Sequence, residues 1–336
     1  MERVLNVGLD YHKNSVQVCA LDGDGRVIVR RRAKNDWIDI KRSLKDHDGP
    51  VFAAIEVGNG AADLADELVN WASWSVDLAH PGYVKRMRQN RDKTDVADAQ
   101  LLADLVRVGY LPKVWLPPQP IRELRRLVNH RRQLVNRRRS LKLSIGSMLN
   151  EQRVTDLPGG RWSRQWMAAA RNCDQLTPVS RWLMEERFEM LEGTVASIAR
   201  AEKMMVRLTA NDPVVQRLVQ FPGVGLVTAC ILRAAVGRFD RFRSGKQLAR
   251  FCGLSPRNVS SGDRKADAGL MDACDRHLRA TLMQLGHRLR RMPGRWREMS
   301  QRLIERGKPG SVANAAVVNR WMRWLYYRMA PLGAGY

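Results

Sequence analysis

Short apolar runs and alternating apolar and polar positions organise the first hundred residues of the chain. Strict alternation predicts two strands joined by the turn Asp22-Gly23-Asp24-Gly25, whose residue types favour a hairpin. Together with the compact apolar runs, this pattern predicts strands at 4–10, 15–21, 26–32, 51–56 and 74–78. Two of these strands end on a carboxylate, at Asp10 and at Glu56.

Helical spacing of apolar residues alternates with these strands. Leu64, Leu68 and Trp71 share one helical face, and Thr94 is a residue type that caps the start of a helix. The spacing predicts helices at 38–44, 61–71 and 94–108. The resulting order, β-β-β-α-β-α-β-α, predicts a mixed α/β domain over residues 1–115.

A proline-rich segment at 112–120 interrupts this pattern and marks a boundary. Apolar residues with the seven-residue spacing of a coiled-coil seam follow it, at Leu127, Leu134, Leu141 and Met148. A second helical arm is predicted at 179–210, so we expect residues 119–210 to form a basic coiled-coil region. The seam can pair with the second arm of the same chain or with another subunit, and the sequence leaves both alternatives open.

The rest of the chain, residues 213–330, is predicted to be mostly helical. Pro222-Gly223-Val224-Gly225 lies between two apolar helical runs. It resembles the glycine-rich turn of a helix-hairpin-helix, whose backbone N–H groups can approach a phosphate. We expect a loop at 253–268, a helix at 271–291 and further helices to Tyr327.

The net charge of the chain indicates which class of molecule it binds. The 336 residues include 58 Lys and Arg against 34 Asp and Glu, a net charge of +24 that attracts polyanions. No apolar run is long enough for a transmembrane helix and no signal peptide is recognised, so nucleic acid is the expected partner and a membrane is not. Five cysteines lie far apart without metal-ligand or disulfide spacing, which predicts a reducing, cytoplasmic location.

Positive charge concentrates on the long helix after the proline-rich segment. Between Pro120 and Val154 there are ten Lys and Arg and two acidic residues, a net charge of +8. A solvated coiled-coil face is one interpretation, and contact with structured RNA or a DNA backbone is the favoured one. The residues expected to contact nucleic acid are Arg125, Arg126, Arg131, Arg132, Arg137, Arg138 and Arg139, with Gly223, Gly225 and Arg257 farther along the chain.

Four carboxylates form the most informative set of chemical groups, and we call them the carboxylate cluster: Asp10, Glu56, Asp95 and Asp98. The first two end strands that can be neighbours in one sheet, and the last two share a helical face because they are three residues apart. Like charges gathered in one place repel unless cations lie between them, and oxygen ligands suit Mg²⁺ or Mn²⁺. We therefore expect the cluster to be catalytic and metal-binding, as in two-metal phosphodiester displacement.

Other conspicuous side chains are given no catalytic role. His12 and His277 lack the spacing of metal ligands, so both are interpreted as ordinary residues. Trp321 and Trp324 lie three residues apart, which favours a place in the core over stacking on nucleic-acid bases.

Several segments resemble a known family. Residues 6–10, 54–60 and 93–99 look like the DEDD signature of the bacterial insertion-sequence transposases that act as bridge-RNA-guided recombinases. Phe221-Pro222-Gly223-Val224-Gly225 and Gly253-Leu254-Ser255-Pro256-Arg257 resemble the second conserved block of that family. The resemblance covers nearly the whole chain. It implies a RuvC-like (RNase H-like) first domain, a coiled-coil insertion and a mostly helical transposase domain.

The resemblance also implies a serine nucleophile that acts with the carboxylate cluster in a composite centre. The matching position is Ser261, and its neighbour Ser260 is the weaker candidate. A serine hydroxyl becomes a good nucleophile only when it is deprotonated or bound to a metal, which a nearby metal site would provide. The implied function is metal-assisted DNA strand cleavage and exchange, guided by an RNA that the element encodes. An assembly of two or four copies is expected.

Two other functions stay open from the sequence. A junction-resolving endonuclease would use the carboxylate cluster and water, without the serine. A non-catalytic scaffold that binds nucleic acid would need neither the carboxylates nor a divalent ion.

Overall fold

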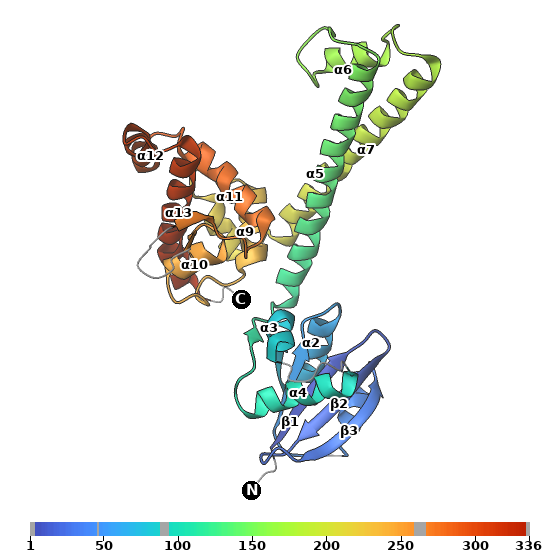
Figure 1. The fold of residues 1–336 in the computed structure, drawn as a ribbon, viewed down its shortest axis with the longest axis vertical. Coiled ribbons are helices and arrows are strands. Elements are labelled where there is room, and N and C mark those ends of the chain that lie inside the picture. Colours follow the sequence, from blue (N-terminus) through green and yellow to red (C-terminus); the bar gives the residue numbers. More distant parts are fainter. Residues whose placement is uncertain (1–3, 46, 88–93, 259–266, 334–336) are drawn as a thin grey trace. The chain divides into compact units, whose positions relative to one another are not determined.

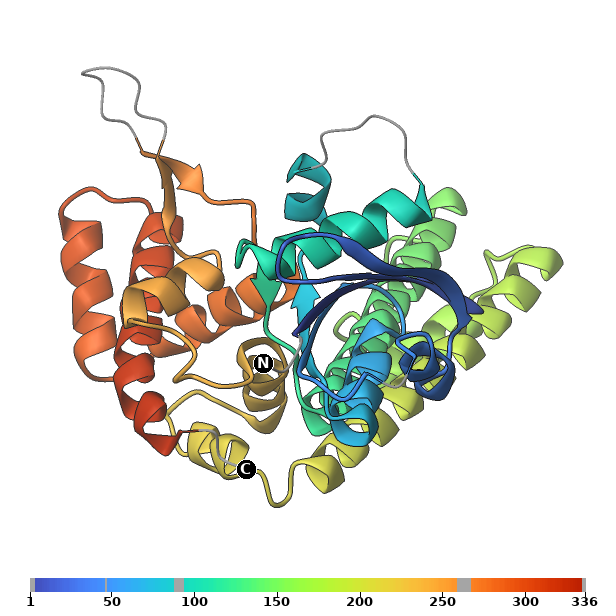
Figure 2. The same cartoon turned by 90° about the horizontal axis from the view of Figure 1, so that it is seen from below.

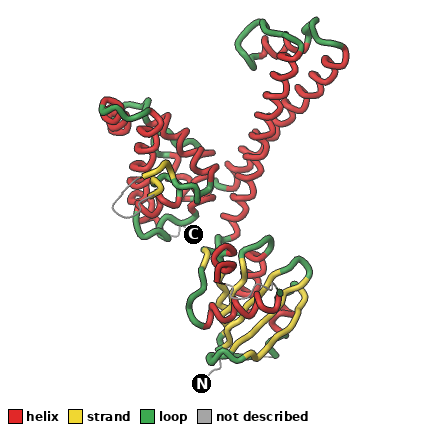
Figure 3. Tube along the Cα trace, in the orientation of Figure 1, coloured by secondary structure: helices red, strands yellow, loops and turns green. Residues whose placement is uncertain are grey.

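A computed structural model of the protein describes residues 4–45, 47–87, 94–258 and 267–333. The chain divides into two compact units, Met1–Pro118 and Gln119–Tyr336, which are described here one at a time. Strands gather in the first unit, and the second is almost entirely helical apart from a short hairpin (Figure 3).

The first unit contains a six-stranded sheet with the order β3-β2-β1-β4-β5-β6. The strands are β1 (Leu5–Tyr11), β2 (Ser15–Leu21), β3 (Val27–Lys34), β4 (Val51–Glu56), β5 (Ser75–Ala79) and β6 (Lys113–Val114). β1, β2 and β3 form an antiparallel meander, while β4 runs parallel to both β1 and β5. The turn between β2 and β3 is closed by the Asp22 carboxylate, which accepts from the backbone N–H of Asp24 and Arg26.

Helices cover both faces of this sheet. They are α1 (Trp37–Arg42), α2 (Ala61–Ala72), α3 (Pro81–Met87) and α4 (Asp95–Arg107). Residues that alternate along a strand point to opposite faces, so β1 buries Leu5, Val7 and Leu9 against α1 and α2. The other face packs against α4, which crosses the sheet in Figure 2 and contacts β1, β2 and β4.

At Gly8, α4 and β1 approach each other closely. A Cβ atom on Gly8 would overlap the backbone carbonyl oxygen of Ala99, which lies in α4. Because this neighbour is backbone, no side-chain rotation can make room. The absence of a side chain at Gly8 therefore sets how near the helix lies to the end of β1.

The expected elements of the first unit are present, with ends that shift by up to a few residues. The prediction that the first and fourth strands are neighbours is confirmed, because β1 pairs with β4. Two short elements were not predicted: α3, which begins at a proline, and β6, which is two residues long and lies in the proline-rich segment.

The second unit is built from nine described helices, α5 to α13, and one hairpin. The helices are α5 (Gln119–Glu151), α6 (Arg164–Arg171), α7 (Pro178–Leu208), α8 (Pro213–Val219), α9 (Leu226–Val236), α10 (Gly245–Phe251), α11 (Arg276–Leu289), α12 (Arg295–Glu305) and α13 (Gly310–Met329). The hairpin strands are β7 (Pro256–Asn258) and β8 (Asp267–Leu270), and a 3-10 turn, η1 (Ala330–Leu332), follows α13.

The two longest helices, α5 and α7, pack against each other in antiparallel directions (Figure 1). Arg131 in α5 forms an ion pair with Glu202 in α7 at an N–O distance of 2.6 Å. Farther along, Arg187 in α7 lies 3.3 Å from the sulfur of Met148 in α5. At the end formed by α6, Met148 joins a small core with Phe188 and Trp166. The predicted seam thus pairs within one chain.

The remaining helices enclose the largest core of the molecule. Trp321 is 1% exposed within it, which confirms the expected core position, and Trp324 packs against its edge. The first turns of α5 also join this core through Leu124 and Val128. Residues 119–210 and 213–330, expected as separate regions, consequently lie in one compact unit.

Two local predictions in this unit differ from the structure. The expected loop at 253–268 contains β7 and the start of β8, and these strands pair at Pro256 with Leu270 and at Asn258 with Asp267. The expected helix from 271 begins only at Arg276, because the Asp275 carboxylate accepts from the N–H of His277 and Leu278 and caps it there. Among the residues described, no helix combines the length and apolar character that a membrane span requires.

Candidate metal centre

The end of β1 supplies two side chains to one place. Asp10 lies two residues beyond Gly8, so its side chain shares the sheet face that packs against α4. His12 follows two residues later, and its backbone N–H donates to the carbonyl of Ser15 at 2.9 Å. This bond ties the connection between β1 and β2 and keeps His12 beside Asp10.

The start of α4 supplies two more side chains to this place, Asp95 and Asp98. Thr94 has extended backbone angles, and its hydroxyl accepts from the N–H of Ala97 at 3.2 Å, so it caps the helix as predicted. Asp95 and Asp98 therefore both fall in the first turn. Asp98 is 6% exposed, an unusual degree of burial for a carboxylate, and Asp95 is exposed.

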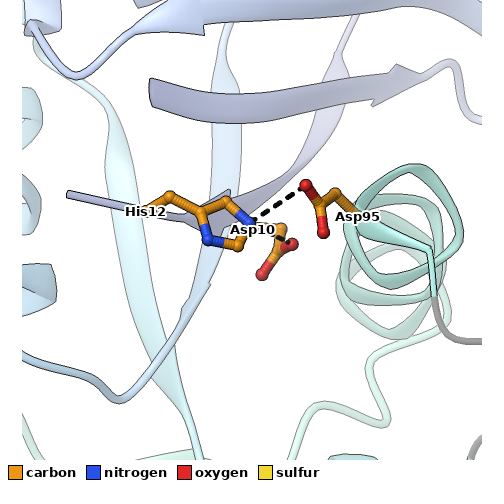
Figure 4. A group of neighbouring side chains, drawn as sticks. All are labelled: Asp10, His12 and Asp95. Atoms are coloured by element: carbon orange, nitrogen blue, oxygen red, sulfur yellow. Dashed lines mark hydrogen bonds and ion pairs between the residues drawn. The ribbon is translucent and has the colours of Figure 1, made fainter. Parts of the chain in front are cut away.

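Three of these side chains meet, as Figure 4 shows. The Nε2 atom of His12 lies 3.2 Å from Oδ2 of Asp10 and 3.2 Å from Oδ2 of Asp95. One possible ligand atom from each residue lies within 4.8 Å of the other two. We call Asp10, His12 and Asp95 the Asp-His-Asp group. Two carboxylate oxygens and one imidazole nitrogen make a donor set that fits a divalent cation.

Electrostatics of the group favour a bound positive charge. Burial raises the pKa of Asp10 above its ordinary value. The neighbouring His12 opposes this rise, while the negative charges of Asp95 and Asp98 add to it. A carboxylate that is half-buried among other carboxylates gains stability from a cation between them, and this agrees with the donor set of the Asp-His-Asp group.

Glu56 lies at the same edge of the sheet but outside the Asp-His-Asp group. β1 and β4 pair in parallel up to Leu9 and Ile55, so Asp10 and Glu56 occupy the next position of each strand. Ala54, two residues before Glu56, packs with Leu102 of α4, which puts Glu56 on the α4 face as well. The carboxylate cluster thus lies on one face, and the possible ligand atoms of Asp10 and Asp95 lie within 4.8 Å of each other.

His12 is the residue of this site that the sequence analysis missed. The sequence analysis interpreted His12 as an ordinary residue, whereas the structure places its side chain between Asp10 and Asp95. The signal in the sequence is the spacing Asp10-x-His12 at a strand end, because residues two apart on a strand share a face. That spacing gains meaning only when α4 brings Asp95 to the same face.

Ser261 and Ser260 lie outside the described residues. The strands β7 and β8 flank them in the sequence, and Arg257 in β7 is exposed. The composite centre that the resemblance implies therefore stays a prediction.

The arginines of α5 fall into two groups. Arg125 donates to the carbonyl oxygen of Ala234 at 2.6 Å, and Arg131 pairs with Glu202, so both hold α5 to its neighbours within the unit. The others expected to contact nucleic acid are exposed or half-buried along α5: Arg126, Arg132, Arg137, Arg138 and Arg139.

The glycine-rich turn joins α8 to α9. Gly223 has a φ of +80°, a backbone conformation that favours glycine, and Gly225 stands at the start of α9 without a side-chain cap. A pocket of about 440 Å³ opens beside Gly225, and Lys203, Thr228 and Arg288 are among its lining residues.

Comparisons with known proteins place this geometry in a family. Residues 7–153 match the DEDD family of IS110 type, described as Transposase, and residues 215–301 match the family described as Transposase IS116/IS110/IS902 family. The first match covers nearly all of the sheet and the whole Asp-His-Asp group. The second spans the turn between α8 and α9 and the β7–β8 hairpin.

Relatives of similar length extend the match over most of the chain. A probable family 20 transposase of Pseudomonas aeruginosa is 27% identical over 334 residues, 95% of each chain. The transposase for insertion sequence element IS1111A of Coxiella burnetii is 26% identical over 84% of this chain and 77% of its own. The transposase for insertion sequence element IS1328 of Yersinia enterocolitica is 24% identical over 96% of both. The chain therefore belongs to the IS110 family of insertion-sequence transposases and is a DNA transposase.

Proposed function

We propose that the protein cleaves and exchanges DNA strands with divalent ions held by the carboxylate cluster and His12. The observation that carries this proposal is the convergence of Asp10, His12 and Asp95, whose possible ligand atoms lie within 4.8 Å of one another. Mg²⁺ or Mn²⁺ is the proposed ion, because carboxylates supply most of the donor atoms.

Each residue of the site has a defined task in this proposal. Asp10 and Asp95 hold the ion, and His12 turns Nε2 toward both of them. Asp98 and Glu56 supply further negative charge on the same face. When bound, the ion stabilises the charge that develops on the oxygens around the phosphorus.

The first unit is proposed to have an RNase H-like fold. The support is the strand order β3-β2-β1-β4-β5, with an antiparallel meander followed by parallel strands and with carboxylates at the ends of β1 and β4. We further propose the boundaries 1–115, 119–210 and 213–330 for the three functional regions, and a helix-hairpin-helix role in phosphate contact for Gly223 and Gly225.

Ser261 is proposed as the nucleophile, on the strength of the family resemblance. Its Oγ atom would bond to the phosphorus while one bridging oxygen leaves, taking up the proton that the serine gives up. Attack on the phosphoserine by a strand-end hydroxyl would reverse these changes and join two strands. The same resemblance supports a guide RNA encoded by the element and an assembly of two or four copies.

The metal site is tested by Asp10→Asn, which keeps the size of the side chain and removes its charge. We expect strand cleavage of an element-end DNA in Mn²⁺ to fall by more than about 100-fold, since losing even an outer partner of a metal ligand costs roughly 10–100-fold. Asp24→Asn is the matched control, because Asp24 is exposed in the β2–β3 turn, where asparagine is equally suited. Full cleavage by Asp10→Asn would contradict the proposed metal site, and no cleavage by the unaltered chain would favour the scaffold interpretation.

The serine step is tested separately with Ser261→Ala and Ser260→Ala. We expect Ser261→Ala to abolish both strand transfer and a covalent protein–DNA adduct trapped by denaturation, and Ser260→Ala to keep both. If Ser261→Ala still cleaves DNA, water is the nucleophile and the junction-resolving alternative is correct. Sequencing of RNA that co-purifies with the chain tests the guide, and the absence of a discrete RNA from the flanking element would contradict it.

A further inference from the structure

Helix α12 carries a line of arginines beside its apolar face. Trp296, Met299 and Leu303 have the spacing of one helical face and are partly buried. Arg295 directly precedes Trp296, Arg302 follows Met299 by three residues and Arg306 follows Leu303 by three. Residues at these spacings lie beside the apolar face, and we call the three arginines its rim. With a rise of about 1.5 Å per residue, this rim extends along about 16 Å of the helix axis.

Arg320 of α13 also lines this surface. These four arginines line a pocket of about 470 Å³, together with Trp296 and two apolar residues. No carboxylate lines the pocket. We call it the arginine pocket, and it lies wholly in the second unit.

The guanidinium groups of the arginine pocket lack carboxylate partners in the part of the chain that the structure describes. Glu298 precedes Arg302 by four residues and Glu305 precedes Arg306 by one, yet no ion pair joins a carboxylate to any arginine of the rim. Arg295 lies over the rings of Trp296 and Trp324, at 4.2 and 4.6 Å from their centres. This stacking holds its guanidinium group at the edge of the pocket.

We propose that the arginine pocket binds the phosphodiester backbone of a nucleic acid. Guanidinium groups match phosphate oxygens in geometry and charge, and several of them around one hollow repel one another until an anion enters. Their spread along the helix suits an extended polyanion better than a single small anion. DNA and RNA share this backbone. The inference rests on the assignment of the protein as an enzyme of nucleic acids, and not on the metal chemistry.

The test measures binding by the full chain in EDTA, so that catalysis plays no part. Fluorescence anisotropy compares the double variant Arg302→Gln/Arg306→Gln with the double variant Arg297→Gln/Lys308→Gln, on labelled duplex DNA and on labelled RNA. Arg297 and Lys308 are exposed, come from the same helix and its end, and lie outside the pocket lining. Both variants remove the same charge, and matching melting temperatures check that both are folded.

For the pocket variant we expect weaker binding and a shallower salt dependence. If each arginine contacts one phosphate, the slope of log K against log salt falls by about 1.8 on duplex DNA or about 1.4 on a single strand. The control variant should keep nearly the full slope. A change on DNA alone or on RNA alone identifies which backbone the pocket binds.

Equal effects of the two variants, or no effect of either, would overturn the proposal. The outcome is independent of the proposed metal centre, because Asp10→Asn should bind normally in EDTA. Loss of cleavage in Asp10→Asn together with unchanged binding in the pocket variant would refute the pocket and leave the proposed function intact.

Discussion

The Asp-His-Asp group and the arginine pocket both gather like charges, but the chain builds them in different ways. Asp10, His12 and Asp95 come from the end of a strand and the start of a distant helix, so sheet register and helix packing must both be correct. Of the four pocket arginines, Arg295 and Arg302 belong to α12 and Arg306 directly follows it. The first site should therefore be sensitive to changes in packing, and the second mainly to changes in its own charges.

Gly8→Ala should have the largest effect that separates the two sites. It alters no charge at either site, but it should weaken metal binding at the Asp-His-Asp group alone. The added methyl group would meet the backbone of Ala99 and force α4 away from β1. Overpacking costs about 1–3 kcal/mol, and more where backbone must move. If moving α4 away from β1 weakens Mn²⁺ binding by about 3 kcal/mol, the Kd for Mn²⁺ rises roughly 100-fold.

Calorimetric titration with Mn²⁺ and hydrogen exchange of α4 and β1 measure this effect. Gly23→Ala is the control, since a Cβ at Gly23 meets no atom within 4 Å. Nucleic-acid binding by the arginine pocket should stay unchanged in both variants. Normal Mn²⁺ binding by Gly8→Ala would show that the site tolerates movement of α4.

His12→Gln tests how much the nitrogen donor of the proposed metal centre contributes beside its two carboxylates. The ring nitrogen is the only non-oxygen donor of the Asp-His-Asp group, so its loss should raise the Kd for Mn²⁺ by about tenfold. Mg²⁺ prefers oxygen ligands, so its Kd should rise less. Titration of each ion measures the ratio. Equal losses for both ions would mean that His12 acts only by holding Asp10 and Asp95 in place.

Thr94→Ala should have a smaller effect on the same site. Removal of the cap that the Thr94 hydroxyl provides to Ala97 destabilises the start of α4 by about 1 kcal/mol. Because Asp95 and Asp98 lie in that first turn, the Kd for Mn²⁺ should rise up to about fivefold. Thr94→Ser keeps the hydroxyl and serves as the control. An unchanged Kd would indicate that the first turn is held by its packing alone.

Arg302→Lys with Arg306→Lys should give the smallest change. The charge stays, but the planar fork that binds two phosphate oxygens at once is lost. We expect a loss of affinity of about two- to threefold in anisotropy, with an unchanged salt slope because the number of neutralised phosphates is the same. A loss as large as that of the glutamine variant would mean that fork geometry, and not charge, governs the pocket.

Much of the proposed metal centre was predictable because its positions follow from strand ends and helix starts. Alternation along β1 and β4 places Asp10 and Glu56 at equivalent positions, and the cap at Thr94 fixes where Asp95 falls. His12 could not be assigned to the site from the sequence, because its contact with Asp95 depends on the distance between α4 and the end of β1. That distance is set by Gly8, whose contact with Ala99 no local pattern reveals.

The arginine pocket and several short elements illustrate what sequence patterns omit. Glu298 and Arg302 are four residues apart, so the sequence pattern alone predicts an ion pair between them. In the structure no such pair forms, and Arg320 of another helix faces the rim instead. The elements α3, β6 and α10 are two to seven residues long, so each offers few positions from which a period can be recognised.

The position of Asp95 and Asp98 in the first turn of α4 affects the order in which folding and ion binding would occur at the proposed metal centre. The unpaired N–H groups of a helix start carry a partial positive charge of about half a unit, which favours acidic residues there. This dipole offsets part of the mutual repulsion of the carboxylates before any ion arrives. We therefore expect the first unit to fold with its site already assembled, so that divalent ions enter a preorganised centre.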